Sequence, residues 1–239
     1  MNLIKKDFLV LLTIPFFALN NLAFAESLES QLKVKREASK SKTPKEIKKK
    51  MHKGVQTLKE SGLADKALGK GKKMPPLNFL NANKKRIALY DYLEKGPVVL
   101  TFYRGSWCPY CMLELKAYQA LVKDFEKYGA TVIAVSPDLP MVSKKTKDKN
   151  GLEFLVLSDV NNRAAKLIGL SFKVDDDTRA IYKNFGINLS KNQGNDENTL
   201  PMPGTYVIDK KGMVQFSYVD PDYTKRAEPS EVLKVVKSL

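Results

Sequence analysis

Apolar and polar positions along the second two thirds of the chain follow periods that predict strands and helices in turn. Residues 98–103 are almost wholly β-branched or aromatic, which is typical of a strand buried on both faces of a sheet. Residues 112–127 repeat their apolar side chains at helical spacing, and residues 131–135 form a second apolar run. Together they predict a β-α-β unit with parallel strands and a right-handed crossover, and hence an α/β sheet.

The alternation of helix and strand patterns continues to the C-terminus. The polar run 189–199 predicts a long surface loop. Residues 205–209 and 213–219 predict an antiparallel hairpin, with Gly212 at the turn position that requires a positive φ. The other patterned segments predict helices over residues 139–149, 161–168, 177–185 and 229–239 and a strand over residues 154–157.

A lysine-rich extension precedes this domain. Residues 26–73 hold fifteen basic and six acidic residues, so they carry +9 of the formal net charge of +15. Apolar residues at helical spacing predict a helix over residues 44–60, started by a capping box of Thr43 and Glu46. The apolar stripe of this helix must rest on the main domain or on a second subunit. Residues 69–73 predict a linker without packing of its own.

The first twenty-five residues have the form of a secretory signal. Basic residues precede an apolar run over residues 8–19 and a final Ala-Phe-Ala. Because an apolar run of about twelve residues is too short to span a bilayer, we expect cleavage after Ala25, export to the periplasm or the medium, and no stable membrane anchor. The predicted division of the chain is a signal peptide at 1–25, a basic helical extension with linker at 26–73, and the α/β domain at 74–239.

Composition excludes several classes of function. The single histidine, His52, lies in the lysine-rich segment far from both cysteines. This removes Ser-His-Asp and Cys-His nucleophile pairs and the usual zinc sites, so we expect neither a metal nor another cofactor. The extension lacks arginine clusters and interleaved aromatic residues, which, together with export, argues against a nucleic-acid partner. A binding protein held on an anionic surface by its basic arm is the lesser alternative.

Both cysteines of the chain lie where the first predicted strand meets its helix. Cys108 and Cys111 are separated by two residues, and a disulfide across so short a loop adds little stability. A reversible dithiol/disulfide pair is therefore the stronger interpretation. Cys108 stands where unpaired backbone N–H groups and the helix dipole lower the pKa of a thiol, and Pro109 suits the first helical turn.

Three motifs stand out in residues 74–239. They are Val-Val-Leu-Thr-Phe-Tyr-Arg-Gly-Ser-Trp-Cys-Pro-Tyr-Cys at 98–111, Phe-Leu-Val-Leu-Ser-Asp at 154–159 and Pro-Gly-Thr-Tyr-Val-Ile-Asp at 203–209. These motifs and the order of elements resemble the thioredoxin fold, and specifically the peroxiredoxins of the alkyl hydroperoxide reductase/thiol-specific antioxidant (AhpC/TSA) family. The resemblance implies a thioredoxin-like α/β fold, with a central mixed sheet flanked by helices, behind the basic helical extension.

The resemblance assigns the two cysteines in two ways. In the thioredoxin-like register the first cysteine attacks and the second resolves, so Cys108 is the nucleophile and Pro203 is a cis-proline opposite the dithiol. In the peroxiredoxin register Cys111 takes the peroxidatic place, Glu114 that of the family's glutamate and Arg104 that of its proline. Cys108 then replaces the family's threonine and Pro203 its later arginine, so half of that motif is missing.

Several side chains are candidates for supporting roles. Glu114 is either a proton carrier for a buried thiol or a solvated helix residue. Arg104 either lowers a cysteine pKa or lies on the surface. Trp107 either shields one side of the dithiol and forms part of a docking surface, or packs in the core. Asp138 and Asp159 follow predicted strands, and we expect them to cap the next helices.

Two enzymatic functions can use these cysteines. The first is a thiol-dependent peroxidase that reduces hydrogen or organic peroxides and is restored by a thioredoxin-like electron donor. The second is a thioredoxin-like protein disulfide oxidoreductase, whose substrate is a protein disulfide. The family resemblance extends along the whole domain and favours the peroxidase.

Overall fold

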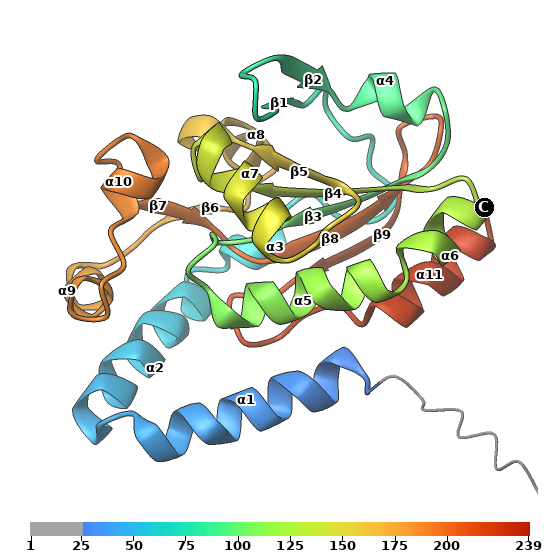
Figure 1. Cartoon of the computed structure of the whole chain (residues 1–239). Coiled ribbons are helices and arrows are strands. Elements are labelled where there is room, and N and C mark those ends of the chain that lie inside the picture. Colours follow the sequence, from blue (N-terminus) through green and yellow to red (C-terminus); the bar gives the residue numbers. More distant parts are fainter. Residues whose placement is uncertain (1–25) are drawn as a thin grey trace, which may run out of the picture.

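The structure, a computed structural model, describes residues 26–239, and the predicted signal peptide lies outside them. A seven-stranded mixed sheet forms the centre of the molecule, and a two-stranded sheet lies beside it (Figure 1). Among residues 26–239, no helix combines the length and the hydrophobicity that a membrane span requires. In spatial order the large sheet contains β2 (Arg86–Ala88), β1 (Asn78–Leu80), β5 (Leu155–Ser158), β4 (Thr131–Ser136), β3 (Val98–Phe102), β8 (Gly204–Ile208) and β9 (Val214–Val219), and the small sheet contains β6 (Ser171–Lys173) and β7 (Thr199–Pro201).

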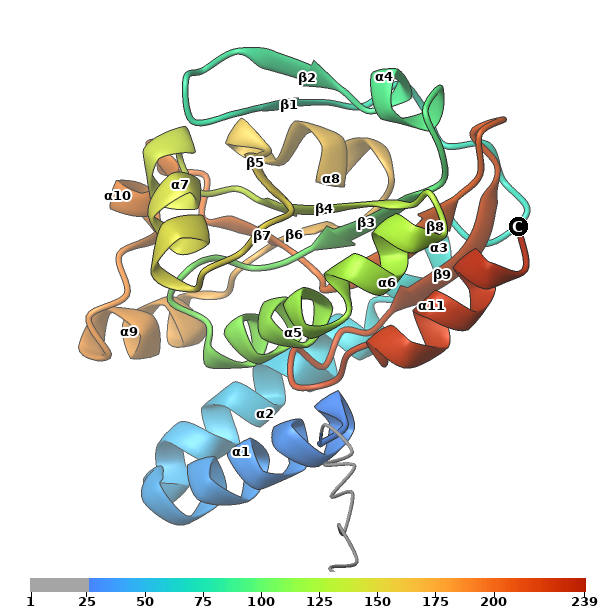
Figure 2. The ribbon, with the colours of Figure 1, turned by 45° about the vertical axis from the view of Figure 1, so that its right-hand side comes forward.

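Helices flank the large sheet on both sides (Figure 2). The extension supplies the first two, which lie together beneath one edge of the domain. In chain order the helices are α1 (Leu28–Lys42), α2 (Lys45–Glu60), α3 (Leu63–Lys66), α4 (Tyr90–Leu93), α5 (Pro109–Ala120), α6 (Val122–Lys127), α7 (Pro140–Lys149), the short 3₁₀ turn η1 (Val160–Asn162), α8 (Arg163–Leu167), α9 (Asp176–Asn184), α10 (Leu189–Gln193) and α11 (Pro229–Lys237).

Strand β3 lies near the middle of the sheet, parallel to β4 and antiparallel to β8. Its side chains are all buried and alternate between two apolar clusters. Val99 packs with side chains of α5, α6 and α11, whereas Leu100 and Phe102 pack with side chains of α4 and α8. The predicted β-α-β unit and the central mixed sheet flanked by helices are therefore confirmed.

Two predicted segments differ in the structure. The helix expected over residues 112–127 is divided at Leu121, where φ is −110° and ψ is 7°, so that α5 and α6 replace it. The loop expected over residues 189–199 contains α10, whose first turn is capped by the Asn188 side chain. A helix of five residues that buries Leu189 and little else is too short for periodicity to reveal.

Helix α1 is an element that the hydrophobic pattern did not predict. Its two buried side chains, Leu28 and Leu32, lie one turn apart and are exposed by 1% and 0%. They pack in the same cluster as both cysteines, and α1 lies against α5. Only the first turn of this helix makes apolar contact with the domain. The remaining turns hold mainly lysines and serines, so the sequence shows no apolar stripe that would have predicted the helix.

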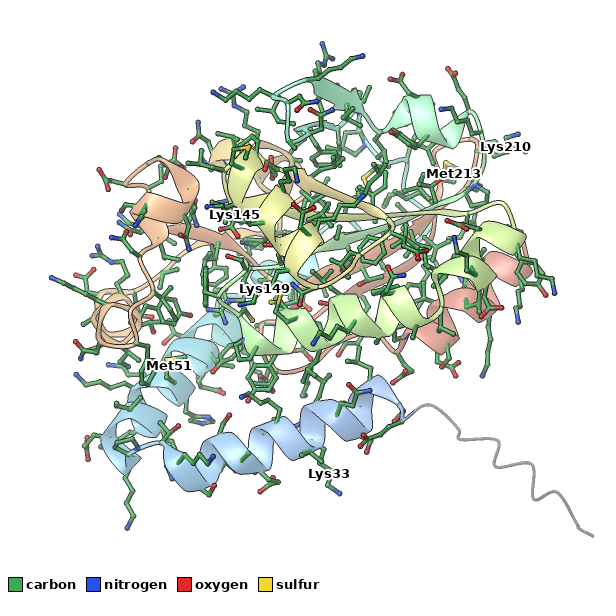
Figure 3. The ribbon with its side chains drawn as sticks, viewed as in Figure 1. Lys33, Met51, Lys145, Lys149, Lys210 and Met213 are labelled. Carbon is green, nitrogen blue, oxygen red and sulfur yellow. The ribbon has the colours of Figure 1, made fainter. Side chains whose placement is uncertain are left out.

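Helix α2 confirms the helix predicted over residues 44–60, but it lacks the predicted capping box. Thr43 has extended backbone (φ −90°, ψ 131°) and ends α1, because a residue that precedes proline avoids the helical region. Met51 and Leu58 pack on clusters of the main domain, so the apolar stripe rests on its own chain. Figure 3 shows Met51 between α2 and α9.

Residues 69–73 were predicted to be a linker without packing of its own. This is wrong, because these residues pair with the hairpin of β8 and β9. The Gly71 N–H donates to the Val214 carbonyl at 2.8 Å, and the Val214 N–H donates to the Lys72 carbonyl at 2.9 Å. The hairpin itself is confirmed. Gly212 has a φ of 82°, and a Cβ added there would lie 2.6 Å from the Tyr90 hydroxyl oxygen.

The packing of α1 predicts that the extension stabilises the whole domain. Replacing Leu32 with alanine should lower the free energy of unfolding by about 2–5 kcal/mol, because it leaves a cavity beside α5. Urea unfolding of the protein measures this loss. Val34→Ala on the same helix is the control, since Val34 is 63% exposed and its truncation should cost less than about 0.5 kcal/mol. Equal stability of both variants would contradict the prediction.

Candidate active site

The loop between β3 and α5, together with the first turn of α5, holds both thiols. Cys108 is the N-cap residue of α5, and Pro109 opens the helix as predicted. The Cys108 Sγ accepts a hydrogen bond from the Cys111 backbone N–H at 3.4 Å. Both cysteines are free thiols, exposed by only 1% and 0%. The structure therefore presents a reduced dithiol whose first sulfur lies at a helix N-terminus.

The loop before Cys108 has little freedom. Gly105 has a φ of 149°, and a Cβ there would lie 2.5 Å from the Trp107 indole nitrogen. The buried carboxylate of Asp138 accepts a hydrogen bond from the Ser106 N–H at 2.8 Å. Asp138 thus fixes this loop, and the expectation that it caps α7 is wrong. Asp159 does cap the next helix, since its carboxylate accepts two N–H groups of α8 at 2.9 Å.

A buried ion pair contacts the second thiol. The Arg226 Nη2 donates to the Cys111 Sγ at 3.3 Å, and its Nε donates to the Glu114 carboxylate at 2.8 Å. Both charged side chains are 1% exposed. Glu114 is therefore not a solvated helix residue. Arg226 belongs to the loop before α11, and the sequence reasoning missed it.

Glu114 is also held from the other side. One carboxylate oxygen accepts from the Thr101 hydroxyl at 3.2 Å. Burial raises the pKa of Glu114 to about 7, against the lowering charge of Arg226 and with a further rise from Cys111. The charge of Glu114 therefore changes with pH near neutrality. Arg226 contacts both this carboxylate and the Cys111 thiol, and so connects them.

A second arginine, Arg104, lies among aromatic rings, and its charge acts on the first thiol. Arg104 is 4% exposed, so it is not a surface residue. Its guanidinium carbon lies 4.3 Å from the ring centre of Tyr223, 5.0 Å from that of Trp107 and 5.5 Å from that of Tyr182, and it donates to the Tyr182 hydroxyl. Aromatic faces stabilise a buried cation that has no carboxylate partner.

The two thiols differ in acidity. Burial disfavours the Cys108 thiolate, but the hydrogen bond from Cys111 and the positive charges of Arg104 and Arg226 outweigh it, so the pKa of Cys108 lies below its usual value. Burial and the neighbouring Cys108 raise the pKa of Cys111 well above its usual value, against the charge of Arg226. At neutral pH the arrangement favours the thiolate at Cys108.

A cleft of about 530 Å³ opens above Cys108. Trp107 and Pro109 line it beside the thiol, and the extension forms part of its wall. Trp107 packs against Tyr182 with ring centres 5.1 Å apart and ring planes at 51°, and it also lines the cleft. The Tyr110 hydroxyl, from the residue between the cysteines, donates to the Ser39 hydroxyl of α1 at 3.3 Å. Access to the dithiol therefore passes the extension.

Pro203 does not have the predicted geometry. All peptide bonds of residues 26–239 are trans, so a cis bond between Met202 and Pro203 is wrong. Pro203 is buried before β8 and lines a small cavity together with Arg104 and Tyr223. The resemblance to the thioredoxin-like motif predicted the cis bond from the position of Pro203 in the sequence alone. Such a position does not determine the isomer of a peptide bond.

The burial of Asp138 predicts a pH effect on stability. Burial raises the pKa of Asp138 to about 6, although the Ser106 hydrogen bonds oppose this shift. Because the unfolded chain loses this proton near pH 4 and the folded chain near pH 6, stability falls as pH rises through that window. Asp138→Asn keeps an acceptor for Ser106, so its free energy of unfolding should gain about 2 kcal/mol relative to the parent between pH 4 and pH 8.

Urea unfolding at these two pH values measures the change, with exposed Asp65 replaced by asparagine as the control. Parallel pH profiles of parent and Asp138→Asn would contradict the assignment.

Within residues 26–239 no group of three or more His, Cys, Asp or Glu side chains is arranged to hold a metal ion.

The chemistry that this arrangement can perform follows from its parts. An acidified thiol at a helix N-terminus, with a second thiol one turn away, suits nucleophilic attack followed by formation of an intramolecular disulfide. The two buried arginines stabilise the anionic forms of both sulfurs. The fold and site together define a thiol-based redox enzyme.

Comparison with known proteins identifies the family. Residues 70–217 match the AhpC/TSA family. Peroxiredoxin Q of Populus jackii is 30% identical over 172 residues, which cover 72% of this chain and 70% of that protein, and peroxiredoxin Q of Triticum aestivum is 29% identical over 179 residues, covering 75% and 71%. The chain belongs to the AhpC/TSA family and is a thiol-dependent peroxidase of the peroxiredoxin type.

Solved structures agree on the fold. Peroxidoxin BcpB from Mycobacterium tuberculosis aligns with a TM-score of 0.56 at 20% identity and covers 72% of this chain and 98% of its own. Reduced Prx3 from Vibrio vulnificus aligns with a TM-score of 0.57 at 17% identity and covers 71% and 99%. The predicted thioredoxin-like fold is thereby confirmed. The helices α1 and α2 precede the residues that match the family.

Proposed function

We propose that the protein is an exported peroxidase that reduces hydrogen or organic peroxides through a Cys108/Cys111 cycle, with a thioredoxin-like electron donor. The observation that carries the proposal is the placement of Cys108 in the lining of a cleft and at the N-terminus of α5, with Cys111 one helical turn behind it. The basic and apolar pattern of residues 1–25 supports export.

The first step takes place at Cys108. Its thiolate attacks the distal oxygen of the peroxide, the O–O bond breaks, and the departing alkoxide or hydroxide takes up a proton to leave as alcohol or water. Cys108 becomes a sulfenic acid, and the peroxide is reduced by two electrons. Arg104 and Arg226 supply positive charge beside the sulfur from which this electron pair comes.

The second step uses Cys111. Its sulfur attacks the Cys108 sulfenic acid and expels water, which leaves a Cys108–Cys111 disulfide. The contact from Arg226 to the Cys111 Sγ stabilises the thiolate that this attack needs, and Glu114 holds Arg226 in place. Glu114 is thus a positioning residue in this proposal. A dithiol donor then reduces the disulfide by exchange.

Rapid mixing tests the proposed function. The reduced mature protein is mixed with hydrogen peroxide or tert-butyl hydroperoxide, and the change in fluorescence of its single tryptophan, Trp107, is followed. We expect oxidation about 10³-fold faster than that of a free thiol, or more, and recovery on addition of reduced thioredoxin. A rate equal to that of a free thiol would overturn the proposed peroxidase function.

The N-terminus of the exported protein tests the predicted cleavage. A mature N-terminus other than Glu26 would overturn it.

A protein disulfide oxidoreductase is the second candidate, favoured by the Cys-x-x-Cys motif at a helix N-terminus. Residues of α1, α2 and α9 line the cleft above Cys108, and this enclosure and the trans bond at Pro203 do not favour a wide protein substrate. Reduction of insulin disulfides distinguishes the two functions. Turnover of insulin without turnover of peroxide would make the second candidate the function.

A further inference from the structure

A groove on the outer face of α5 adjoins the dithiol on the side away from α2 and α9. Helix α5 runs between α7 and α1 (Figure 1 and Figure 2), and side chains of all three helices line the groove, whose volume is about 620 Å³. Trp107 and Pro109, the neighbours of Cys108 in the chain, belong to the lining. Among the described residues, α2 and α9 contribute nothing to it, so a protein can approach the first turn of α5 from this side.

Part of the lining is apolar. Met112, Leu113 and Val142 line the groove, and each is half-buried. The end of α7 meets α5 here, where the Asn150 amide donates to the Met112 sulfur at 3.6 Å. Met141, the neighbour of Val142, is 52% exposed, although it is a large apolar side chain. Exposed apolar side chains grouped beside an active site are typical of a surface that another protein covers.

The charged part of the lining is wholly basic. No aspartate or glutamate of the described residues lines the groove, and its charged members are Lys35, Lys116, Lys145 and Lys149. Within residues 26–239, none of these four ammonium groups has a carboxylate within 4 Å or a hydrogen-bond acceptor. The nearby carboxylate of Asp148 is already paired with Lys144. Four uncompensated charges from three helices favour an extended acidic surface as the partner.

The proposed catalytic cycle ends with a step that needs such a partner. A donor thiolate attacks the Cys108 sulfur of the disulfide, the S–S bond breaks, and Cys111 leaves as a thiolate that takes up a proton. The second thiolate of the donor then attacks the mixed disulfide and releases the Cys108 thiolate. The donor leaves as a disulfide, oxidised by two electrons. During this exchange the donor must contact the chain around Cys108, which the basic groove adjoins.

We propose that this groove is the docking surface of the electron donor, and that the donor is a thioredoxin-like protein with an acidic surface beside its own dithiol. The proposal rests on the proposed function, which makes the Cys108–Cys111 disulfide part of the cycle. Lys116 and Lys149 pair with carboxylates of the donor, and the apolar lining contacts the side chains around its dithiol. Lys35 makes the extension part of the same surface. Complementary charge speeds association, and salt screens it.

Reduction of a preformed disulfide tests the docking without peroxide. The protein is oxidised with diamide and mixed with a reduced thioredoxin of net negative charge, or with dithiothreitol, and its thiols are counted by mass spectrometry after an acid quench. The double variant Lys116→Glu with Lys149→Glu should react with the thioredoxin about tenfold more slowly at low salt, and high salt should remove most of this difference. Dithiothreitol is uncharged and needs no docking surface, so it should reduce parent and variant at the same rate.

The matched control is the double variant Lys33→Glu with Lys210→Glu. It changes the net charge by the same amount at two exposed lysines that do not line the groove. Figure 3 shows Lys33 beyond α1 and Lys210 at the far end of the sheet, whereas Lys145 and Lys149 lie on α7. The control should change the rate with the thioredoxin by less than about twofold. Equal slowing of both double variants, or equal slowing with dithiothreitol, would overturn the docking assignment.

Exchange of charge on the donor completes the test. A thioredoxin variant with lysines in place of its acidic surface residues should reduce the Lys116→Glu/Lys149→Glu variant faster than it reduces the parent. The same order of rates with both donors would overturn the proposal and leave a small anion as the occupant of the groove. Because the disulfide is made without peroxide, a rate with hydrogen peroxide equal to that of a free thiol would overturn the peroxidase but leave the docking result standing.

Discussion

Replacing Cys108 with serine is expected to abolish the rapid reaction of the reduced protein with hydrogen peroxide, with a loss of about 10³-fold or more. Replacing Cys111 should preserve that first step and stop the cycle at a sulfenic acid on Cys108. The reason is the difference in acidity, since Cys108 lies at the helix N-terminus and lines the cleft, whereas Cys111 lies behind it with a raised pKa.

A chemical probe for sulfenic acid, followed by mass spectrometry, identifies the oxidised sulfur. The chain contains no other cysteine, so each single variant leaves one thiol to label, and the double variant sets the background. Rapid oxidation of Cys111 in the Cys108→Ser variant would reverse the assignment. It would mean that the peroxiredoxin register, with Arg226 in place of the family's later arginine, describes the chemistry.

The dithiol and its position could be predicted because all of its determinants are local in sequence. The apolar run of β3, the spacing of Cys108 and Cys111, and Pro109 at the helix start lie within fourteen residues. The larger strands and α2 were also predicted, because they are long enough to repeat their pattern. Helices α1 and α10 were not, since α1 buries only two leucines of its fifteen residues and α10 is a single short turn that buries one.

The electrostatic half of the site could not be predicted in the same way. Arg226 is 115 residues from Cys111, and it reaches the thiol only because α11 packs against α6 and β9 and the loop before α11 lies against α5. A signal was nevertheless present in Glu114, which lies on the same helix face as Cys111 and Leu115. A carboxylate on a buried face requires a cation or a proton, and the search for its partner would have led beyond the motif.

Arg226→Met is expected to destabilise the protein by about 3–5 kcal/mol and to slow formation of the disulfide by about 10²-fold. Methionine fills similar space, but it leaves the Glu114 carboxylate buried without its cation and withdraws the donor from the Cys111 Sγ. Urea unfolding measures the first effect, and rapid mixing with hydrogen peroxide, with the disulfide trapped by acid, measures the second. Arg163→Met, at an exposed position of α8, is the control and should change neither.

The double variant Glu114→Gln with Arg226→Met separates stability from chemistry. Removing both charges avoids an unpaired buried ion, so most of the lost stability should return. The rate of disulfide formation should remain low, because no positive charge then contacts Cys111. Recovery of both quantities would mean that Arg226 serves only to neutralise Glu114. Recovery of stability alone would show that the protein maintains a buried ion pair in order to activate its second thiol.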